Sequence, residues 1–294
     1  MTGILIVNEF LNQNKFNEIH QWLLNAARKY DIHLQLKTNA ELLIQIDGLY
    51  KKPDADFILF WDKDVRLAYY LELLGYPVFN SSKAIEICDD KSLTHLTLMK
   101  HGIPMPETII IPKTFENIGY TNYQFLIEIS DNLGFPLIIK ECFGSFGQQV
   151  YLVKDYEELL EQVKKIGAKP LLFQKFIKTS MGRDLRLQVV GNKVIASMQR
   201  FATNGDFRAN ITIGGRMLPL EPTKEQCELA LRCCEVIGLD FAGVDLLFGE
   251  DEEPIVCEIN SNAHFKNIYD CTGINAAEAI MEHIITKLNK ERNY

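Results

Sequence analysis

The chain has 294 residues, more than one average domain, so we expect two or three subdomains that share a core. Its net charge of −8 argues against nucleic acid as the main partner, because phosphate binding needs concentrated lysine and arginine. No stretch approaches the roughly 18 to 20 uncharged apolar residues that cross a bilayer, so we expect no membrane partner.

The cysteines and the N-terminus indicate a cytoplasmic protein. Seven cysteines occur and no two form a Cys-x-x-Cys pair, which favours reduced thiols over a disulfide framework or a zinc site. Residues 1–7 lack basic side chains, and Glu9 interrupts the apolar run that follows Gly3. We therefore interpret the N-terminus as a first buried strand and not as a signal peptide.

Residues 1–85 alternate apolar runs with amphipathic ones. This alternation predicts parallel β-α-β units and hence a small doubly wound sheet. No Gly-x-Gly-x-x-Gly follows the first strand, so nothing marks a dinucleotide site. We expect this domain to contribute one wall of a substrate cleft. Its predicted elements are strands over 4–7, 57–60 and 77–79 and helices over 16–30 and 67–74.

The remaining chain is predicted to mix helices with antiparallel strands, in two further subdomains over 86–177 and 178–294. Asp89 or Asp90 can cap a helix that ends near Gly102. The fold class is therefore α/β followed by α+β. Strands are predicted over 136–140, 150–153, 171–177, 185–190 and 193–198, the last two as a hairpin through Gly191-Asn192, and helices over 155–166, 223–237 and 275–288.

Near the end of the chain, two apolar strands flank an acidic turn at residues 249–254, which predicts an antiparallel hairpin. If the turn centres between residues 251 and 252, Asp245 lies opposite Glu258. Asn260 then projects from the same face as Glu258, because strand side chains alternate. Facing carboxylates repel each other unless a cation lies between them, and Mg²⁺ prefers such oxygen ligands. The alternative is an ordinary polar strand face.

Basic residues form a second candidate group. Lys140 ends an apolar strand and precedes the small loop Gly144–Gly147, whose backbone amides can approach a phosphate closely. Lys91 stands at the start of the capped helix, and each lysine is a weak signal alone. Arg186 and Arg200 lie in or beside apolar strand patterns, where a guanidinium usually meets a carboxylate or a phosphate in bidentate fashion. Structural salt bridges are the alternative for these arginines.

With these residues assembled, the chain resembles the ATP-grasp superfamily and, within it, the RimK-type and LysX-type amino-acid ligases. The resemblance covers essentially the whole chain and is dense from Asp89 to Gly273. It implies an ATP-grasp fold with an N-terminal Rossmann-like (pre-ATP-grasp) domain. The segments that carry it are Gly182-Arg183-Asp184-Leu185-Arg186, Gly205-Asp206-Phe207-Arg208-Ala209-Asn210, Ala242-Gly243-Val244-Asp245, Glu258-Ile259-Asn260 and Thr272-Gly273-Ile274-Asn275.

The resemblance implies a role for each matching residue. Mg²⁺, with Mn²⁺ as an alternative, would be held by Asp245, Glu258 and Asn260. Arg200 would stabilise an acyl phosphate, and Arg186 would hold a substrate carboxylate. The ATP site would comprise Lys91 and Lys140 at the phosphates, a flap with Ser145 and Gly147, the adenine segment Gln174, Lys175, Phe176 and Ile177, Asp184 at the ribose, and Arg208 with Asn210. The family commonly has Glu where Lys175 stands, a change that a main-chain contact to adenine tolerates.

The resemblance also implies the reaction. A carboxylate attacks the γ-phosphate of ATP to give an acyl phosphate, and an amine then displaces phosphate to leave an amide. The partners would be glutamate or another amino acid and a carboxylate-bearing acceptor, which is a small molecule, a peptide or a carrier protein. Family members are often dimers or tetramers, so a homo-oligomer is one of the expected states.

Other functions are open as well. Phe265-Lys266-Asn267 is more similar to the LysX type, which works on a carrier protein, than to the RimK type. A kinase on the same fold would transfer phosphate to a hydroxyl and would share the whole phosphate half of the site. A non-catalytic nucleotide-binding protein is a further alternative, against which the complete set of expected metal ligands argues.

Overall fold

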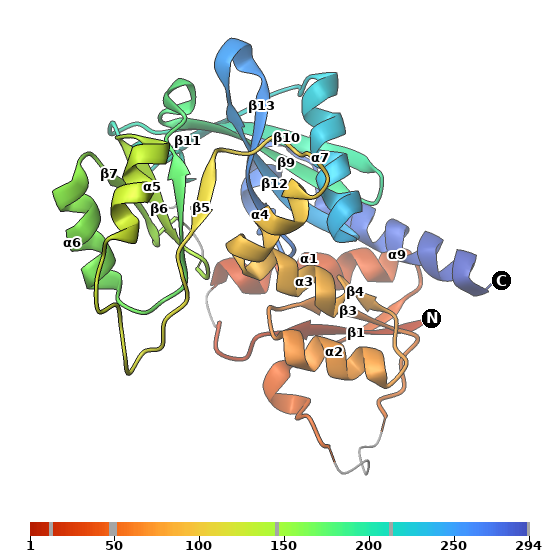
Figure 1. The fold of residues 1–294 in the computed structure, drawn as a ribbon. Coiled ribbons are helices and arrows are strands. Elements are labelled where there is room, and N and C mark those ends of the chain that lie inside the picture. The colour runs from red at the N-terminus through yellow and green to blue at the C-terminus, as the bar shows by residue number, and fades with distance from the viewer. Residues whose placement is uncertain (12–13, 47–51, 145–146, 212–213, 293–294) are drawn as a thin grey trace.

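A computed structural model describes the chain except residues 12–13, 47–51, 145–146, 212–213 and 293–294 (Figure 1). The described residues form three sheets, one four-stranded at the N-terminus, one four-stranded in the middle and one five-stranded near the C-terminus. Every described helix is too short or too polar to cross a lipid bilayer.

The N-terminal sheet is parallel, with strand order β2-β1-β3-β4. Along β1, Leu5 packs in the core that includes α1, while Ile4 and Ile6 pack in the core that includes α2. The sheet is therefore buried on both faces, and the predicted doubly wound sheet is confirmed. The sequence analysis does not predict the edge strand β2, because Leu34 is its one buried residue and the strand has no apolar run. The elements are β1 (Thr2–Val7), α1 (Asn14–Lys29), β2 (His33–Thr38), η1 (Asn39–Glu41), β3 (Phe57–Trp61), α2 (Val65–Leu73), β4 (Val78–Phe79) and α3 (Ser82–Asp89).

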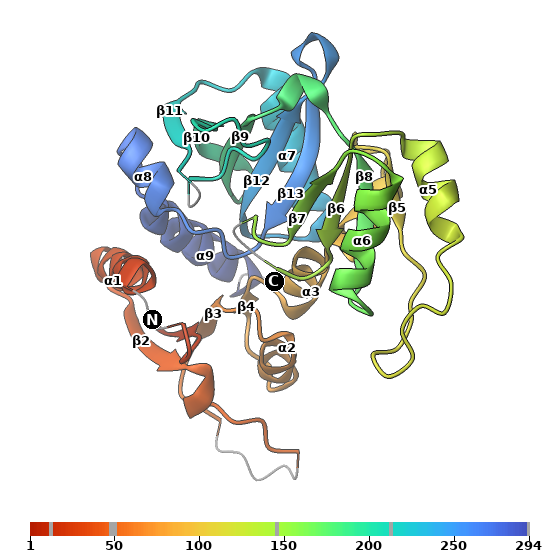
Figure 2. The ribbon, with the colours of Figure 1, turned by 90° about the vertical axis from the view of Figure 1, so that its left-hand side faces the viewer.

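The middle sheet is antiparallel, with strand order β5-β8-β6-β7. Its core joins Leu126 of α5 and Leu159 of α6 to Phe173 of β8, so both helices cover one face (Figure 2). The preceding helix α4 begins as predicted, because the Asp90 carboxylate accepts the backbone N–H of Ser92 at 2.8 Å. The elements are α4 (Lys91–Met99), β5 (Thr108–Ile110), α5 (Phe125–Leu133), β6 (Leu137–Glu141), β7 (Val150–Val153), α6 (Tyr156–Ile166) and β8 (Leu171–Lys175).

The third sheet is also antiparallel, with strand order β11-β10-β9-β12-β13. Cys233 of α7 packs with Val244 on one face, and Ile280 of α9 packs with Met198 on the other. Helix α9 also contacts α1, so the N-terminal and C-terminal sheets share one core. The elements are η2 (Lys178–Ser180), β9 (Arg183–Val190), β10 (Lys193–Phe201), β11 (Arg216–Pro219), α7 (Lys224–Ile237), β12 (Phe241–Phe248), η4 (Glu250–Glu252), β13 (Pro254–Asn260), α8 (Lys266–Thr272) and α9 (Ala276–Arg292).

Asn80 joins the N-terminal sheet to β12 and β13. Its Nδ2 donates to the carbonyl oxygens of Phe241 at 2.9 Å and Ser261 at 2.7 Å. Its Oδ1 accepts the backbone N–H of Asp240 at 2.6 Å. The side chain is 1% exposed, so water cannot replace these hydrogen bonds.

We expect Asn80→Ala to lower the free energy of unfolding by about 3 kcal/mol, because it leaves buried backbone groups without partners. Urea unfolding measures this loss. Asn132→Ala is a matched control, since the Asn132 amide hydrogen-bonds to the Glu128 carbonyl at an exposed position. The control should cost less than about 0.5 kcal/mol. Equal effects of the two substitutions would show that Asn80 does not join the N-terminal sheet to β12 and β13.

Candidate active site

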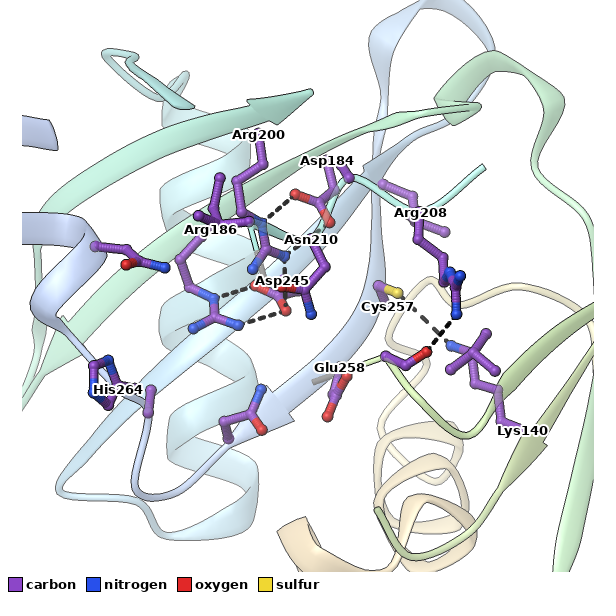
Figure 3. Close-up of a pocket in the computed structure, with 18 of the residues that line it drawn as sticks. Lys140, Asp184, Arg186, Arg200, Arg208, Asn210, Asp245, Cys257, Glu258 and His264 are labelled. Atoms are coloured by element: carbon purple, nitrogen blue, oxygen red, sulfur yellow. Dashed lines mark hydrogen bonds and ion pairs between the residues drawn. The ribbon is translucent and has the colours of Figure 1, made fainter. Parts of the chain in front are cut away.

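A cavity of about 770 Å³ is lined by residues of all three sheets. Figure 3 shows the part of its wall that the middle and C-terminal sheets form. The sequence analysis singles out residues from distant parts of the chain, and most of them line this cavity together. Lys91 lies beside it, and Ser145 lies outside the described residues. The predicted residues on the cavity wall are Lys140, Gly147, Gln174, Lys175, Phe176, Ile177, Asp184, Arg186, Arg200, Arg208, Asn210, Asp245, Glu258 and Asn260.

The β12–β13 hairpin brings the predicted metal ligands together. Asp245 pairs with Glu258, as the sequence predicts. The pairing shifts by one residue directly after Asp245, which leaves Cys257 as an extra residue in β13. The turn is therefore centred slightly earlier than expected, and the bulge restores the predicted pair. Because of the bulge, Cys257 and Glu258 both line the cavity although they are neighbours in sequence.

Two aspartates and two arginines form a largely buried ionic cluster on β9, β10 and β12. Arg200 binds both carboxylate oxygens of Asp184, at 2.6 and 2.8 Å, and also lies 3.0 Å from Asp245. Arg186 binds both oxygens of Asp245, one of them at 2.7 Å. Burial opposes ionisation of Asp245, but the two guanidinium groups outweigh burial and hold its pKa below the usual range. Burial raises the pKa of Asp184 even beside Arg200. The ion pairs hold both arginines in place at the cavity wall.

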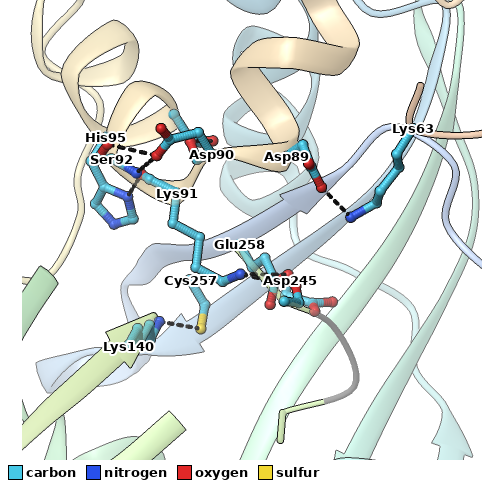
Figure 4. Close-up of polar contacts among 12 residues, drawn as sticks. Lys63, Asp89, Asp90, Lys91, Ser92, His95, Lys140, Asp245, Cys257 and Glu258 are labelled. Carbon is cyan, nitrogen blue, oxygen red and sulfur yellow. Dashed lines mark hydrogen bonds and ion pairs between the residues drawn. The ribbon is translucent and has the colours of Figure 1, made fainter. Parts of the chain in front are cut away.

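Two buried lysines approach the hairpin from the other side of the cavity (Figure 4). The Lys91 Nζ donates to the Gly144 carbonyl at 3.2 Å and lies 3.9 Å from Glu258 Oε1. The Lys140 Nζ lies 3.7 Å from the Cys257 sulfur. Neither ammonium group makes a close ion pair with the described carboxylates, so both can bind an anion such as a phosphate.

Arg208 connects two loops at the edge of the cavity. Its Nη1 donates to the Gly147 carbonyl at 2.7 Å, and its Nε and Nη2 bind the Asp206 carboxylate at 3.0 and 2.8 Å. A methyl group added to Gly147 would lie 3.5 Å from the Asn210 amide nitrogen, so the two loops are in contact there. The predicted flap and the predicted phosphate-binding residues therefore meet in this structure.

The side chain of Gln174 is fixed from behind by His95. Gln174 Nε2 lies 2.7 Å from His95 Nε2 and 2.9 Å from Thr108 Oγ1. His95 Nδ1 lies 2.7 Å from the Lys91 carbonyl, which can only accept, so Nδ1 carries the proton and Nε2 accepts from Gln174. Burial, helped by Lys140, lowers the pKa of His95 to about 4. The neutral imidazole thus links the predicted adenine segment to the predicted phosphate lysine.

The rest of the predicted adenine segment has its own contacts. The Lys175 ammonium pairs with the Glu107 carboxylate at 2.5 Å, both side chains being exposed. The Phe176 ring meets the Phe207 ring edge to face, with centroids 6.4 Å apart. The Lys175 side chain is thus already paired outside the nucleotide. Its backbone N–H donates to the Glu107 carbonyl at 3.0 Å, so the predicted main-chain contact would use its carbonyl oxygen.

The N-terminal sheet supplies a wall that the sequence analysis expects only in general terms. Asn8, Trp61 and Asp62 follow or end strands β1 and β3 and line the cavity, as do His20 and His264. None of them stands out in the sequence, because a polar residue after an apolar strand is ordinary. The available signal is that carboxyl ends of parallel strands gather at one edge of a sheet.

The segment Phe265-Lys266-Asn267 is divided between core and cavity. Phe265 is fully buried and packs edge to face on Trp61, at 5.7 Å. Lys266 and Asn267 line the cavity. Within this segment, Lys266 and Asn267 can therefore touch a substrate directly, and Phe265 cannot.

Comparison with known proteins identifies relatives of the chain. Residues 88–284 match the RimK-like ATP-grasp domain. Beta-citrylglutamate synthase B from Danio rerio is 33% identical over 230 residues, which cover 77% of this chain and 55% of that protein. N-acetylaspartylglutamate synthase A from Homo sapiens is 32% identical over 228 residues, which cover 77% of this chain and 57% of that protein. The chain thus spans little more than half the length of these curated relatives.

The fold has close matches among solved structures. The RimK domain ATP-grasp protein from Sphaerobacter thermophilus superposes with a TM-score of 0.73 over 96% of this chain and 99% of that chain, at 20% identity. The predicted ATP-grasp fold, with a parallel N-terminal sheet and two antiparallel sheets, is confirmed.

The buried histidines predict acid sensitivity. The pKa of His20 is lowered to about 4 by burial and by the nearby His264, and the pKa of His95 is lowered to about 4 as well. Between pH 6.5 and 4 the unfolded chain therefore binds protons that the folded chain does not. We expect the free energy of unfolding to fall as the pH drops through this window, by up to about 1.4 kcal/mol per pH unit for each histidine.

Urea unfolding at pH 7.5, 6 and 5 measures this slope. His20→Asn should flatten the slope, whereas His33→Asn, at an exposed position, should keep it. Unchanged stability of the wild-type protein between pH 7.5 and 5 would show that these histidines are not held neutral.

Proposed function

The chain belongs to the RimK-like ATP-grasp family, and from this premise we propose that it is an ATP-dependent ligase that joins a carboxylate to an amine. Glutamate is the proposed amino acid, because the names of both curated relatives describe a glutamate conjugate although the other component differs. The acceptor would be a carboxylate-bearing small molecule, peptide or carrier protein. ADP, phosphate and an amide would be the products. A cytoplasmic location is proposed as well, since all seven cysteines are free thiols.

The observation that carries this proposal is a set of oxygen ligands beside cations that lack close partners. Asp245, Glu258 and Asn260 line one wall, and Lys91 and Lys140 reach toward it. The donor set fits Mg²⁺, which prefers carboxylate and amide oxygens. Glu258 has its nearest cation at 3.9 Å, and the Asn260 side chain makes no hydrogen bond with the described residues, so both have acceptor capacity left. Asp245 already binds Arg186 and Arg200, so Glu258 and Asn260 would supply the free oxygens, with Asp245 as the third ligand. The metal ion would neutralise phosphate charge when bound.

The chain's own residues would act mainly by position and charge. Lys91, Lys140 and Arg208 would bind the phosphates of ATP. Arg200, held on two sides by buried carboxylates, would stabilise the charge of the acyl phosphate and of the tetrahedral intermediate without having to reorganise. Arg186, the second guanidinium of the cluster, is proposed to hold the carboxylate of the substrate.

Phosphate release from ATP and Mg²⁺ with L-glutamate and a panel of carboxylates tests the proposal, with mass spectrometry of each product. We expect a product lighter by one water than the sum of glutamate and acceptor. Glu258→Gln should lose the activity and keep the fold. Glu258→Gln tests the metal site more cleanly than Asp245→Asn does. The latter would leave Arg186 and Arg200 sharing one carboxylate in the interior.

Other products would point to the alternatives. A product heavier by a phosphoryl group would instead identify a kinase of the same fold. Activity that requires a carrier protein as acceptor would indicate the LysX type, for which the Lys266-Asn267 segment on the cavity wall is the candidate contact.

The role of Arg200 gives a separate prediction. Arg200→Lys keeps the positive charge but cannot bind Asp184 in bidentate fashion and reach Asp245 at the same time. We expect kcat to fall by roughly 10² with a small change in KM for ATP. Steady-state kinetics measures both constants. Arg232→Lys, at an exposed position on α7, should behave as wild type. Wild-type kcat in Arg200→Lys would remove Arg200 from the catalytic residues.

A further inference from the structure

The N-terminal sheet has a topological switch point on the cavity. Its strand order is β2-β1-β3-β4, so the chain leaves β1 toward one edge of the sheet and leaves β3 toward the other. A crevice for ligands forms at the carboxyl ends of two such strands. Asn8 directly follows β1, and Asp62 directly follows β3. Both residues line the cavity, so the crevice opens into the candidate active site.

Asp62 is a buried carboxylate without a cationic partner. It is 4% exposed and accepts hydrogen bonds from Asn8 Nδ2, at 3.1 and 3.3 Å, and from the backbone N–H of Lys63 at 2.8 Å. Among the described residues it forms no ion pair. The Lys63 ammonium is bound instead to Asp89, at 2.7 Å (Figure 4). Burial raises the pKa of Asp62 in spite of these hydrogen bonds and of the nearby Lys63, so they compensate the ionised carboxylate only in part.

The surroundings of Asp62 are neutral or already paired. Trp61 is stacked on Phe241 at 5.4 Å, which holds the end of β3 in place. His20, on the same wall, is uncharged at neutral pH because burial lowers its pKa to about 4. Lys266 pairs with Asp270 at 3.0 Å and with Glu18 at 3.4 Å. Each cation that the structure describes on this wall is therefore already paired, and the Lys63 ammonium, bound to Asp89, compensates Asp62 only in part.

The structure assigns a substrate to this carboxylate. We propose that Asp62, positioned by Asn8, binds the ammonium group of the amine substrate, which is glutamate under the proposed function. A ligase that joins a carboxylate to an amine has one reactant that must carry an amine, and this amine arrives protonated. The phosphates and the acceptor carboxylate are anions, which a buried carboxylate repels. Asp62 therefore selects the amine substrate over the other reactants by its charge.

Binding of a matched pair of ligands tests this assignment apart from turnover. L-glutamate and glutarate have the same two carboxylates, but only L-glutamate has the ammonium group. Calorimetric titration in the presence of Mg²⁺ and a non-hydrolysable ATP analogue measures both affinities. We expect wild-type protein to prefer L-glutamate by at least about 10-fold, as is usual for a buried charge pair. Asp62→Asn should abolish this preference.

Asp64→Asn is the matched control, since it makes the same change of charge two residues away. Asp64 caps α2 by accepting the backbone N–H of Leu67, which asparagine also does, and it does not line the cavity. We expect this variant to keep the preference for L-glutamate. An equal loss in both variants would show a general effect of charge and would overturn the proposal.

An exchanged pair guards against a folding defect in Asp62→Asn. In the double variant Asn8→Asp with Asp62→Asn, an amide at position 62 can donate to a carboxylate at position 8. That carboxylate can still accept the backbone N–H of Phe10, as Asn8 does at 2.9 Å. The exchange keeps the net charge and the hydrogen bonds and moves the carboxylate across the crevice. We expect it to recover part of the preference that the single variant loses.

The outcomes separate this proposal from the proposed function. If Asp62→Asn discriminates as wild type does, or if wild type itself does not discriminate, Asp62 does not bind the ammonium group of glutamate. A separate titration with the ATP analogue reports independently on the nucleotide site. If Asp62→Asn raises KM for the acceptor and not for glutamate, the carboxylate serves the acceptor, and the assignment is wrong.

Discussion

The site depends on the balance of two arginines against two aspartates, whose side chains are all mostly covered. Arg186 and Arg200 bring two positive charges into the interior, and Asp184 and Asp245 bring two negative ones. Removing any one of the four would leave an uncompensated buried charge, which is far more costly than the loss of a surface pair. The cluster thereby fixes β9, β10 and β12 relative to one another. Its arginines need little reorganisation to face negative charge that develops during a reaction.

The position of the N-terminal wall follows from contacts at the ends of β12 and β13. Asn80 binds the carbonyl of Ser261, the residue directly after the proposed ligand Asn260. Trp61 stacks on Phe241, the first residue of β12. The strands that carry the metal ligands are thus anchored to the sheet that carries Asp62. The cavity is therefore a property of the three sheets together, and none of them forms it alone.

The sequence predicts the hairpin well because its signals are local. Asp245 and Glu258 flank one turn, so counting along two strands brings them together even though the bulge at Cys257 is not foreseen. The sequence shows a glycine at position 243, but it does not show why a glycine is required there. A methyl group there would lie 2.6 Å from the Ala263 Cβ and 3.0 Å from Arg186 Nη1, so only glycine lets this guanidinium approach Asp245.

The N-terminal wall could not be predicted in the same way. Asn8 and Asp62 meet because β1 and β3 are neighbours in the sheet, and the strand order is a property of the whole domain. Taken alone, each of these residues is an ordinary polar residue after an apolar strand. The same limit applies to His95, whose link between Gln174 and Lys91 depends on the packing of α4 against β8.

The residues proposed for phosphate chemistry and for amine recognition lie in different parts of the chain. The match to the RimK-like ATP-grasp domain covers residues 88–284, which include every proposed metal and phosphate ligand, whereas Asp62 lies before it. The two parts are nevertheless held in one frame. Lys63, next to Asp62, binds Asp89, which directly precedes the residue that caps α4, and α4 begins with Lys91 (Figure 4). Under these proposals, a change in the N-terminal wall would alter which amine is bound without touching the phosphate ligands, while the Lys63–Asp89 ion pair keeps the two sites in register.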